Sequence, residues 1–164
     1  MKRFLFLLLA VASTAGASRR LLLADSGTRE LKLVDLKIET VQWKSGGIYC
    51  YDTHRLPSGN ILYCDEQNKK SGKSHVRETT PDGKVVKKFT QKKEDMPEGM
   101  VNRFYSGFTL LKNGDVITGH WAGHGPGGSK KAYQLIQFNK EGKIVWFWHD
   151  PKRAGSALQA IIMD

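Results

Sequence analysis

Short runs of alternating hydrophobic and polar residues, separated by turn-forming residues, follow one another along the chain from residue 20 onward. The first three runs cover residues 20–26, 30–36 and 40–43, and in the second run Leu31 and Leu33 fall on one face. This period of two is typical of a β-strand. No stretch beyond residue 17 holds apolar residues at the i, i+3, i+4, i+7 spacing of a helix over three turns. The pattern therefore predicts an all-β protein.

The strand pattern repeats with a period of about 45–50 residues. Each unit has two turns centred on glycine, which supplies the positive φ that such turns need. The first turn lies at residues 56–60 and 111–115, and the second at residues 81–84 and 140–143. A fixed period with a β-rich run after each turn is typical of the four-stranded blade of a β-propeller.

A third, more divergent unit is found when the chain is aligned on the second turn. Residues 36–43 then match residues 80–87 and 139–146. Glu39 stands where the other two units have a glycine, and Trp43 and Trp146 share one position. We expect these tryptophan rings to pack one blade against the next, because large flat rings stabilise such interfaces. A ligand-binding role for them is the alternative.

The two ends of the chain complement each other. The first unit begins directly with its second strand at residues 20–26, and residues 157–164 resemble an isolated first strand. We therefore expect the first unit to be split between the termini, which pairs the edges of the sheet. The count is then about three blades, whereas propellers have four to eight. The chain would assemble with another copy, adopt an open arc, or be a shortened form of a longer protein.

Residues 1–17 have the pattern of a signal peptide. Lys2 and Arg3 precede an apolar run at residues 4–11, and Ala-Gly-Ala at 15–17 is a typical cleavage site. The apolar run is too short for a stable membrane span. We expect cleavage before Ser18, export to the periplasm or the extracellular space, and a repeat domain at 18–164; an uncleaved anchor is the alternative.

The chain is basic, with 26 Lys and Arg against 16 Asp and Glu; loss of the first 17 residues leaves 24 against 16, a charge of +8. A basic exported domain suits an anionic small molecule or a glycan as partner. The lysines are scattered over turns and strand ends, which also fits a surface that keeps the protein soluble and protects sheet edges. No nucleic-acid-binding motif is present, so we do not expect that partner.

Cys50 and Cys64 flank the turn at residues 56–60 and would meet an oxidising compartment. A type I turn places them diagonally on paired strands, about 7–8 Å apart and beyond normal disulfide reach. The sequence leaves two alternatives, a disulfide between the two cysteines or two buried free thiols.

The glycine-rich segment at residues 119–129 is the first candidate site, with His120, Trp121 and His124 as ligand-binding residues. The two histidines are four apart, but the glycines around them disfavour the helix that a zinc-binding pair would need, so no metal site is expected. His120 is a candidate general base. The alternative is a loop held by histidine hydrogen bonds.

The second candidate site lies on the first strands of two units, which line the central channel of a propeller. Asp52 and His54 share a face, so the carboxylate would orient the imidazole. Arg103 and Tyr105 occupy the corresponding stretch of the next unit. These four residues would form a polar pocket that accepts an anion, or they are channel residues bound to water.

Residues 56–62 and 35–43 resemble the PQQ-type (quinoprotein-like) β-propeller repeat family. Leu-Pro-Ser-Gly-Asn-Ile-Leu is similar to the LPNGN(I/L)L turn of that repeat, and Asp-Leu-Lys-Ile-Glu-Thr-Val-Gln-Trp to a divergent D-x-x-T-G-K-V-x-W. The resemblance covers nearly all of the chain beyond residue 17. It implies the fold, but not the quinone cofactor, since the calcium site and adjacent cysteines of those enzymes are missing.

Arylsulfotransferases are similar at the same places, notably in a histidine before the Leu-Pro-x-Gly-Asn turn, which is His54 here. The sequence thus predicts a binding or scaffold module without a cofactor, completed by a protein partner or by self-association. The alternative is a transferase or hydrolase that acts on an anionic or sugar substrate with His54 or His120 as acid or base. An enzyme requires one of these histidines within reach of an orienting acid.

Overall fold

The computed structural model describes residues 19–46, 50–66, 74–121, 123, 128, 130–157, 160, 161 and 163. The strands are β1 Arg20–Asp25, β2 Glu30–Asp35, β3 Thr40–Gly46, β4 Thr53–Arg55, β5 Ile61–Glu66, β6 Ser74–Thr79, β7 Val85–Phe89, β8 Phe104–Leu110, β9 Val116–Trp121, β10 Leu135–Phe138 and β11 Ile144–Trp148. A short 3-10 helix, η1, covers Lys93–Asp95.

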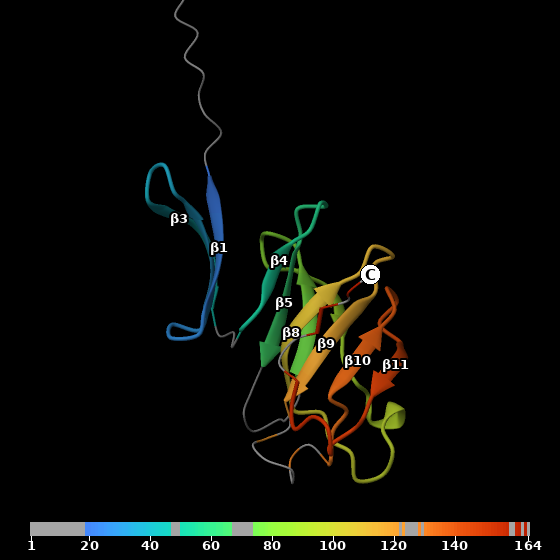
Figure 1. The fold of residues 1–164 in the computed structure, drawn as a ribbon. Coiled ribbons are helices and arrows are strands. Elements are labelled where there is room, and N and C mark those ends of the chain that lie inside the picture. Colours follow the sequence, from blue (N-terminus) through green and yellow to red (C-terminus); the bar gives the residue numbers. More distant parts are fainter. Residues whose placement is uncertain are drawn as a thin grey trace, which may run out of the picture.

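Within the described residues these strands form three antiparallel sheets of consecutive strands. Sheet 1 contains β1–β3, sheet 2 contains β4–β7, and sheet 3 contains β8–β11. Figure 1 shows the sheets following one another across the molecule, with sheet 2 between sheets 1 and 3. The predicted all-β class is confirmed, whereas the arrangement of the sheets as propeller blades stays a prediction.

Each sheet contains a β-bulge before its last turn. The bulges lie at Leu33/Val34, Glu78/Thr79 and Gln137/Phe138. Each following turn holds one residue with positive φ: Glu39 at 51°, Gly83 at 89° and Gly142 at 84°. These bulges and turns fall at positions that the sequence alignment makes equivalent. Glu39 therefore adopts the left-handed backbone of the glycines, which costs free energy for a residue with a Cβ.

Sheet 2 is covered on both faces because its strands alternate apolar residues toward two neighbours. Leu62, Cys64 and Val76 belong to the cluster shared with sheet 3. Ile61 and Tyr63 belong to the cluster shared with sheet 1, where Leu31 is fully buried and Trp43 packs against them.

The C-terminal segment makes its contacts with sheet 3. The Ser106 hydroxyl donates a hydrogen bond to the Ala157 carbonyl at 3.1 Å, and the Thr109 hydroxyl donates to the Ala160 carbonyl. Both donors belong to β8. We expected residues 157–164 to complete the first unit, but the described part of this segment is bonded to β8, and sheet 1 has three strands within the described residues.

Candidate functional site

Asp52 and His54 form an acid–imidazole pair at the start of β4. The His54 Nε2 lies 3.4 Å from the Asp52 Oδ1, with the imidazole about half exposed and the carboxylate mostly buried. The other carboxylate oxygen accepts a hydrogen bond of 2.9 Å from the Phe108 backbone N–H in β8. The His54 ring also packs on the Phe108 ring, with centroids 4.9 Å apart. The result is a surface imidazole held in place by an acid and an aromatic ring.

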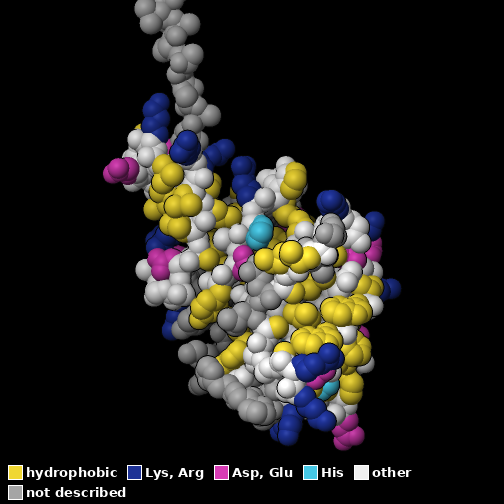
Figure 2. Space-filling model, viewed as in Figure 1, with side chains coloured by type: hydrophobic (Ala, Val, Ile, Leu, Met, Phe, Trp, Pro, Cys, Tyr) yellow, Lys and Arg dark blue, Asp and Glu magenta, His cyan; other side chains and the backbone are white. Residues whose placement is uncertain are grey.

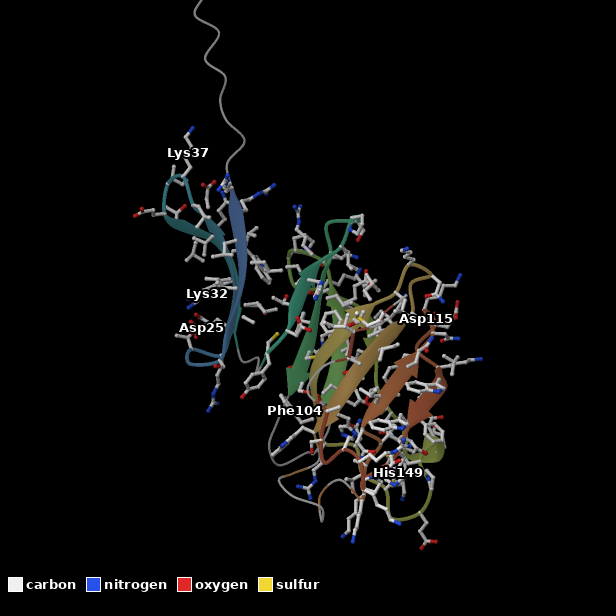
Figure 3. The ribbon with its side chains drawn as sticks, in the orientation of Figure 1. Asp25, Lys32, Lys37, Phe104, Asp115 and His149 are labelled. Carbon is white, nitrogen blue, oxygen red and sulfur yellow. The ribbon has the colours of Figure 1, made fainter. Side chains whose placement is uncertain are left out.

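Tyr51, Phe104 and Trp121 form a row of aromatic rings, called the aromatic row below. The Tyr51 and Phe104 rings meet edge to face at 5.2 Å, and the Phe104 and Trp121 rings do so at 6.3 Å. Phe104, labelled in Figure 3, begins β8 and pairs with Trp121 at the end of β9. Tyr51 is exposed and the other two are partly exposed. Tyr51 and Trp121 each combine an apolar ring with a polar O–H or N–H group that a ligand can use.

Arg103 directly precedes Phe104 of the aromatic row in the sequence, and its side chain is exposed. Its backbone N–H donates a hydrogen bond of 2.8 Å to the Nε2 of His120. The guanidinium therefore supplies a positive charge at the start of β8.

His120 lies in the core, with 1% of its surface exposed. Its Nδ1 bonds the Tyr133 carbonyl at 3.0 Å, and its Nε2 accepts the Arg103 N–H. This pattern fixes the neutral tautomer with the proton on Nδ1. Burial lowers the pKa of His120 to about 4, against a smaller raising effect of the Tyr133 carbonyl. Because both ring nitrogens are used and water is excluded, this imidazole is not placed to exchange a proton with a ligand.

Tyr105 is also buried rather than exposed on the strand face with Asp52. Its ring contacts the rings of His120 and Phe138, and its hydroxyl accepts a hydrogen bond of 2.9 Å from the Gln91 N–H. Burial raises the pKa of Tyr105 well above its usual value. This side chain therefore holds sheets 2 and 3 together instead of lining a pocket.

The structure thus separates the seven residues that the sequence singled out. It joins Asp52 to His54, leaves Arg103 and Trp121 at the surface, and places Tyr105 and His120 in the core; His124 lies outside the described residues. Sequence reasoning missed Tyr51, Phe104 and Phe108. The one feature that could have indicated them is that aromatic residues lie in and before the first strands of two units.

Cys50 and Cys64 are both buried free thiols. The Cys50 thiol donates to the Asp52 carbonyl, which also accepts the Cys64 N–H at 3.1 Å. Burial raises the pKa of Cys50 to about 12 and that of Cys64 well above its usual value. Neither thiol is activated as a nucleophile, since only the thiolate reacts.

A groove of about 280 Å³ lies elsewhere, between β5–β7 with the first turn of sheet 2 and the end of β8 with the turns of sheet 3. Its charged groups are Glu78, Lys87 and Lys140, and its lining includes none of the predicted site residues. In the described part of the chain, no cluster of three or more His, Cys, Asp or Glu side chains has the arrangement of a metal site. Within the same residues no helix has the length and apolar character needed to cross a membrane.

Comparison with known proteins identifies similar solved structures but no family. The sequence matches no protein-family model and no curated protein. Hydrazine synthase from Kuenenia stuttgartiensis is similar in structure, with a TM-score of 0.51 and 13% identity over 78% of this chain. This chain spans 32% of that protein's length. A protein of unknown function from Bacteroides caccae matches with a TM-score of 0.32 and 18% identity, over 80% of this chain and 79% of that one.

At this identity the likeness to hydrazine synthase concerns the fold alone. Neither structure is named for PQQ repeats, so the family resemblance stays a prediction. The chain is an all-β protein whose sheet architecture is compatible with a propeller-like fold.

Proposed function

We propose that this chain is an exported β-propeller-type protein of PQQ-like repeats that binds an anionic or sugar ligand along its inner strands β4 and β8. The observations that carry the proposal are the aromatic row and the Asp52–His54 pair, both built from residues 51–54 and β8: Tyr51 contacts Phe104, and His54 contacts Phe108. Exposed aromatic groups with a few fixed polar partners are the usual composition of a ligand site.

The chemistry of a sugar suits this arrangement. The apolar C–H face of a sugar ring stacks on an aromatic side chain such as Tyr51, which is well exposed. The ring hydroxyls find an acceptor in Asp52 and a polar partner in His54. Arg103 pairs with a sulfate or carboxylate group, and the net charge of +10 on the full sequence favours the approach of an anion.

A titration with a sulfated oligosaccharide and its desulfated counterpart tests this proposal. Binding is followed by tryptophan fluorescence and calorimetry. We expect the sulfated ligand to bind more tightly, and the substitutions Tyr51→Ala and Trp121→Ala to weaken binding about tenfold each. Phe147→Ala is the matched control, because Phe147 is an exposed aromatic side chain on β11. Wild-type affinity in Tyr51→Ala and Trp121→Ala, or no binding of either sugar, would overturn the proposal.

A second candidate function is a transferase or hydrolase that uses His54 as its acid or base. It is favoured by the 3.4 Å approach of the Asp52 carboxylate to the imidazole, because a neighbouring carboxylate can orient an imidazole that acts as acid or base. His120 has no part in this candidate because it is buried and both its nitrogens are bonded. In the same assay, turnover of an aryl sulfate that disappears in His54→Gln while the ligand still binds would favour the enzyme over the binding module.

A further inference from the structure

Sheets 1 and 3 each have a face that no other sheet covers in the described structure. On sheet 1, Leu22 and Trp43 point toward sheet 2, so the alternating residues Leu21 and Leu23 point away from it. They are 42% and 37% exposed. On sheet 3, Trp146 is 45% exposed. Figure 2 shows hydrophobic side chains gathered over sheet 1 at one side and over the strands of sheet 3 at the other.

The open face of sheet 1 carries the same kinds of residue as the face of sheet 2 that sheet 1 covers. Counted from the bulges, Leu21 and Leu23 match Ile61 and Tyr63, the two residues through which sheet 2 receives sheet 1. The ion pair on the same face matches too: Asp25–Lys32 in sheet 1 corresponds to Asp65–Arg77 in sheet 2. The open face of sheet 1 is therefore composed to receive another sheet.

The open face of sheet 3 carries Trp146, which matches the tryptophan that sheet 1 packs against sheet 2. Trp43 packs against the cluster that contains Ile61 and Tyr63, and it is opposite Leu33, next to the bulge of sheet 1. Trp146 is opposite Gln137, next to the bulge of sheet 3, and so matches Trp43. Because Gln137 alternates with the core residues Ile136 and Phe138, Trp146 points away from sheet 2.

The C-terminal segment lies on the same side. The inner strand β4 is bonded to β8 through the Asp52 carboxylate and the Phe108 N–H. On the other side of β8, the Thr109 hydroxyl donates a hydrogen bond to the Ala160 carbonyl, so the C-terminal residues contact β8 as the β4 segment does. Thr109 alternates with the core residue Phe108 and so faces away from sheet 2. Ala157 and Ala160 thus lie where a further inner strand would stand, and among the described residues sheet 1 has three strands where sheets 2 and 3 have four.

We propose that two copies of this chain join head to tail, with sheet 3 of each copy packed against sheet 1 of the other. Trp146 of one copy then covers Leu21 and Leu23 of its partner, as Trp43 covers the cluster that contains Ile61 and Tyr63 within the chain. Ala157 and Ala160 take the place of a first strand beside the partner's sheet 1. The product is a closed ring of six sheets, within the four to eight of known propellers.

The ring brings the inner strands of both copies around one channel, so that two Asp52–His54 pairs line the same space. The inference rests on the propeller-type arrangement proposed above but not on its ligand. Association is measured as mass and ligand binding as a titration, so a failure of one is distinguishable from a failure of the other.

Sedimentation of the purified chain tests the contact. We expect a species of twice the chain mass at micromolar concentration. Leu23→Asp and Trp146→Asp place a charge in the interface and should each raise the dissociation constant about 30-fold or more. Val86→Asp is the control, since Val86 is at least as exposed, at 51%, but lies on the outer strand of sheet 2. Circular dichroism verifies that each variant keeps its strands.

A cysteine pair distinguishes this ring from other assemblies. Under oxidation the double variant Leu23→Cys, Trp146→Cys should form a covalent dimer, whereas each single variant should not, because the two positions meet only head to tail. A monomer at all concentrations would show that something other than a second copy covers these faces and would overturn the proposal. Crosslinking of a single variant, or an open series of larger species, would do so as well.

Discussion

Sheets 1 and 2 hold the same ion pair at matching positions, and the two pairs have opposite surroundings. Arg77 Nη2 lies 2.6 Å from Asp65 Oδ2, with side chains 9% and 1% exposed. Lys32 Nζ lies 2.7 Å from Asp25 Oδ2, with side chains 20% and 34% exposed, and also contacts Glu30 at 3.1 Å. Both residues of the exposed pair are labelled in Figure 3.

The pKa values of the two carboxyls move in opposite directions. Burial raises the pKa of Asp65, although the charge of Arg77 acts against it. The hydrogen bond from Lys32 holds the pKa of Asp25 well below its usual range. Desolvation of the charges therefore costs free energy for the pair in the covered sheet, whereas the pair in the open sheet keeps its contact with solvent. The acid is an aspartate in both pairs. What differs is the neighbouring sheet, together with the cation, which is Arg77 in sheet 2 and Lys32 in sheet 1.

Removing the cation should have its largest effect in the covered pair. Arg77→Leu leaves Asp65 buried without its partner, and we expect a loss of about 3–5 kcal/mol in the free energy of unfolding. Urea denaturation measures it. The folded pKa of Asp65 is already raised, so its stability contribution is greatest at low pH and is lost as the pH rises. The defect of Arg77→Leu should therefore shrink on acidification, as Asp65 takes up a proton.

Lys32→Leu is the matched substitution in the open pair. In the monomeric chain, below the concentration at which copies associate, water and Lys44, which also contacts Glu30 at 3.2 Å, remain near the acids. The effect of Lys32→Leu should there be a small fraction of the Arg77→Leu effect. Equal losses in the two variants would mean that covering by sheet 1 does not decide the energetics of this position.

His120 stands at the matching end of the second strand in sheet 3, and it extends the comparison to pH. Its native pKa is about 4, below the value of about 6.5 expected for the unfolded chain. The unfolded chain thus gains a proton first as the pH falls. The contribution of neutral His120 is complete above pH 6.5 and declines toward pH 4, by on the order of 3 kcal/mol. Denaturant midpoints measured between pH 7 and 5 should fall, and should fall less in His120→Gln. An unchanged slope in that variant would contradict the assignment.

Substitution of Glu39 is the one change that we expect to stabilise the chain. Its φ of 51° is the conformation that Gly83 and Gly142 adopt in the other two sheets. Glu39→Gly should stabilise the chain by about 1 kcal/mol, because it removes the left-handed strain of a residue with a Cβ. Glu141→Gly, at a neighbouring turn position without positive φ, should instead destabilise slightly. An unchanged or lowered urea midpoint in Glu39→Gly would mean that the entropy which glycine adds to the unfolded chain outweighs the strain that it relieves.

The strands and turns were predictable from the sequence because their causes are local. Alternation at Leu31 and Leu33 predicts the bounds of β2 to within one residue. Gly83 and Gly142 mark turns, and both glycines have positive φ in the structure. The proximity of Asp52 and His54 follows from alternation within one strand as well. The aromatic row was not predictable in this way, since Tyr51, Phe104 and Trp121 come from three segments that only the packing of β4, β8 and β9 brings together.

The sequence by itself determined the all-β class, the order of the strands and the residues that carry charge or rings at matching positions. The tertiary structure decided which of those positions are covered. His54 and His120 differ little as residues in a β-rich sequence, yet one is half exposed beside an acid and the other is bonded on both nitrogens in the core. The physical reason is that alternation sets the face on which a side chain lies, whereas burial depends on which distant sheet packs against that face.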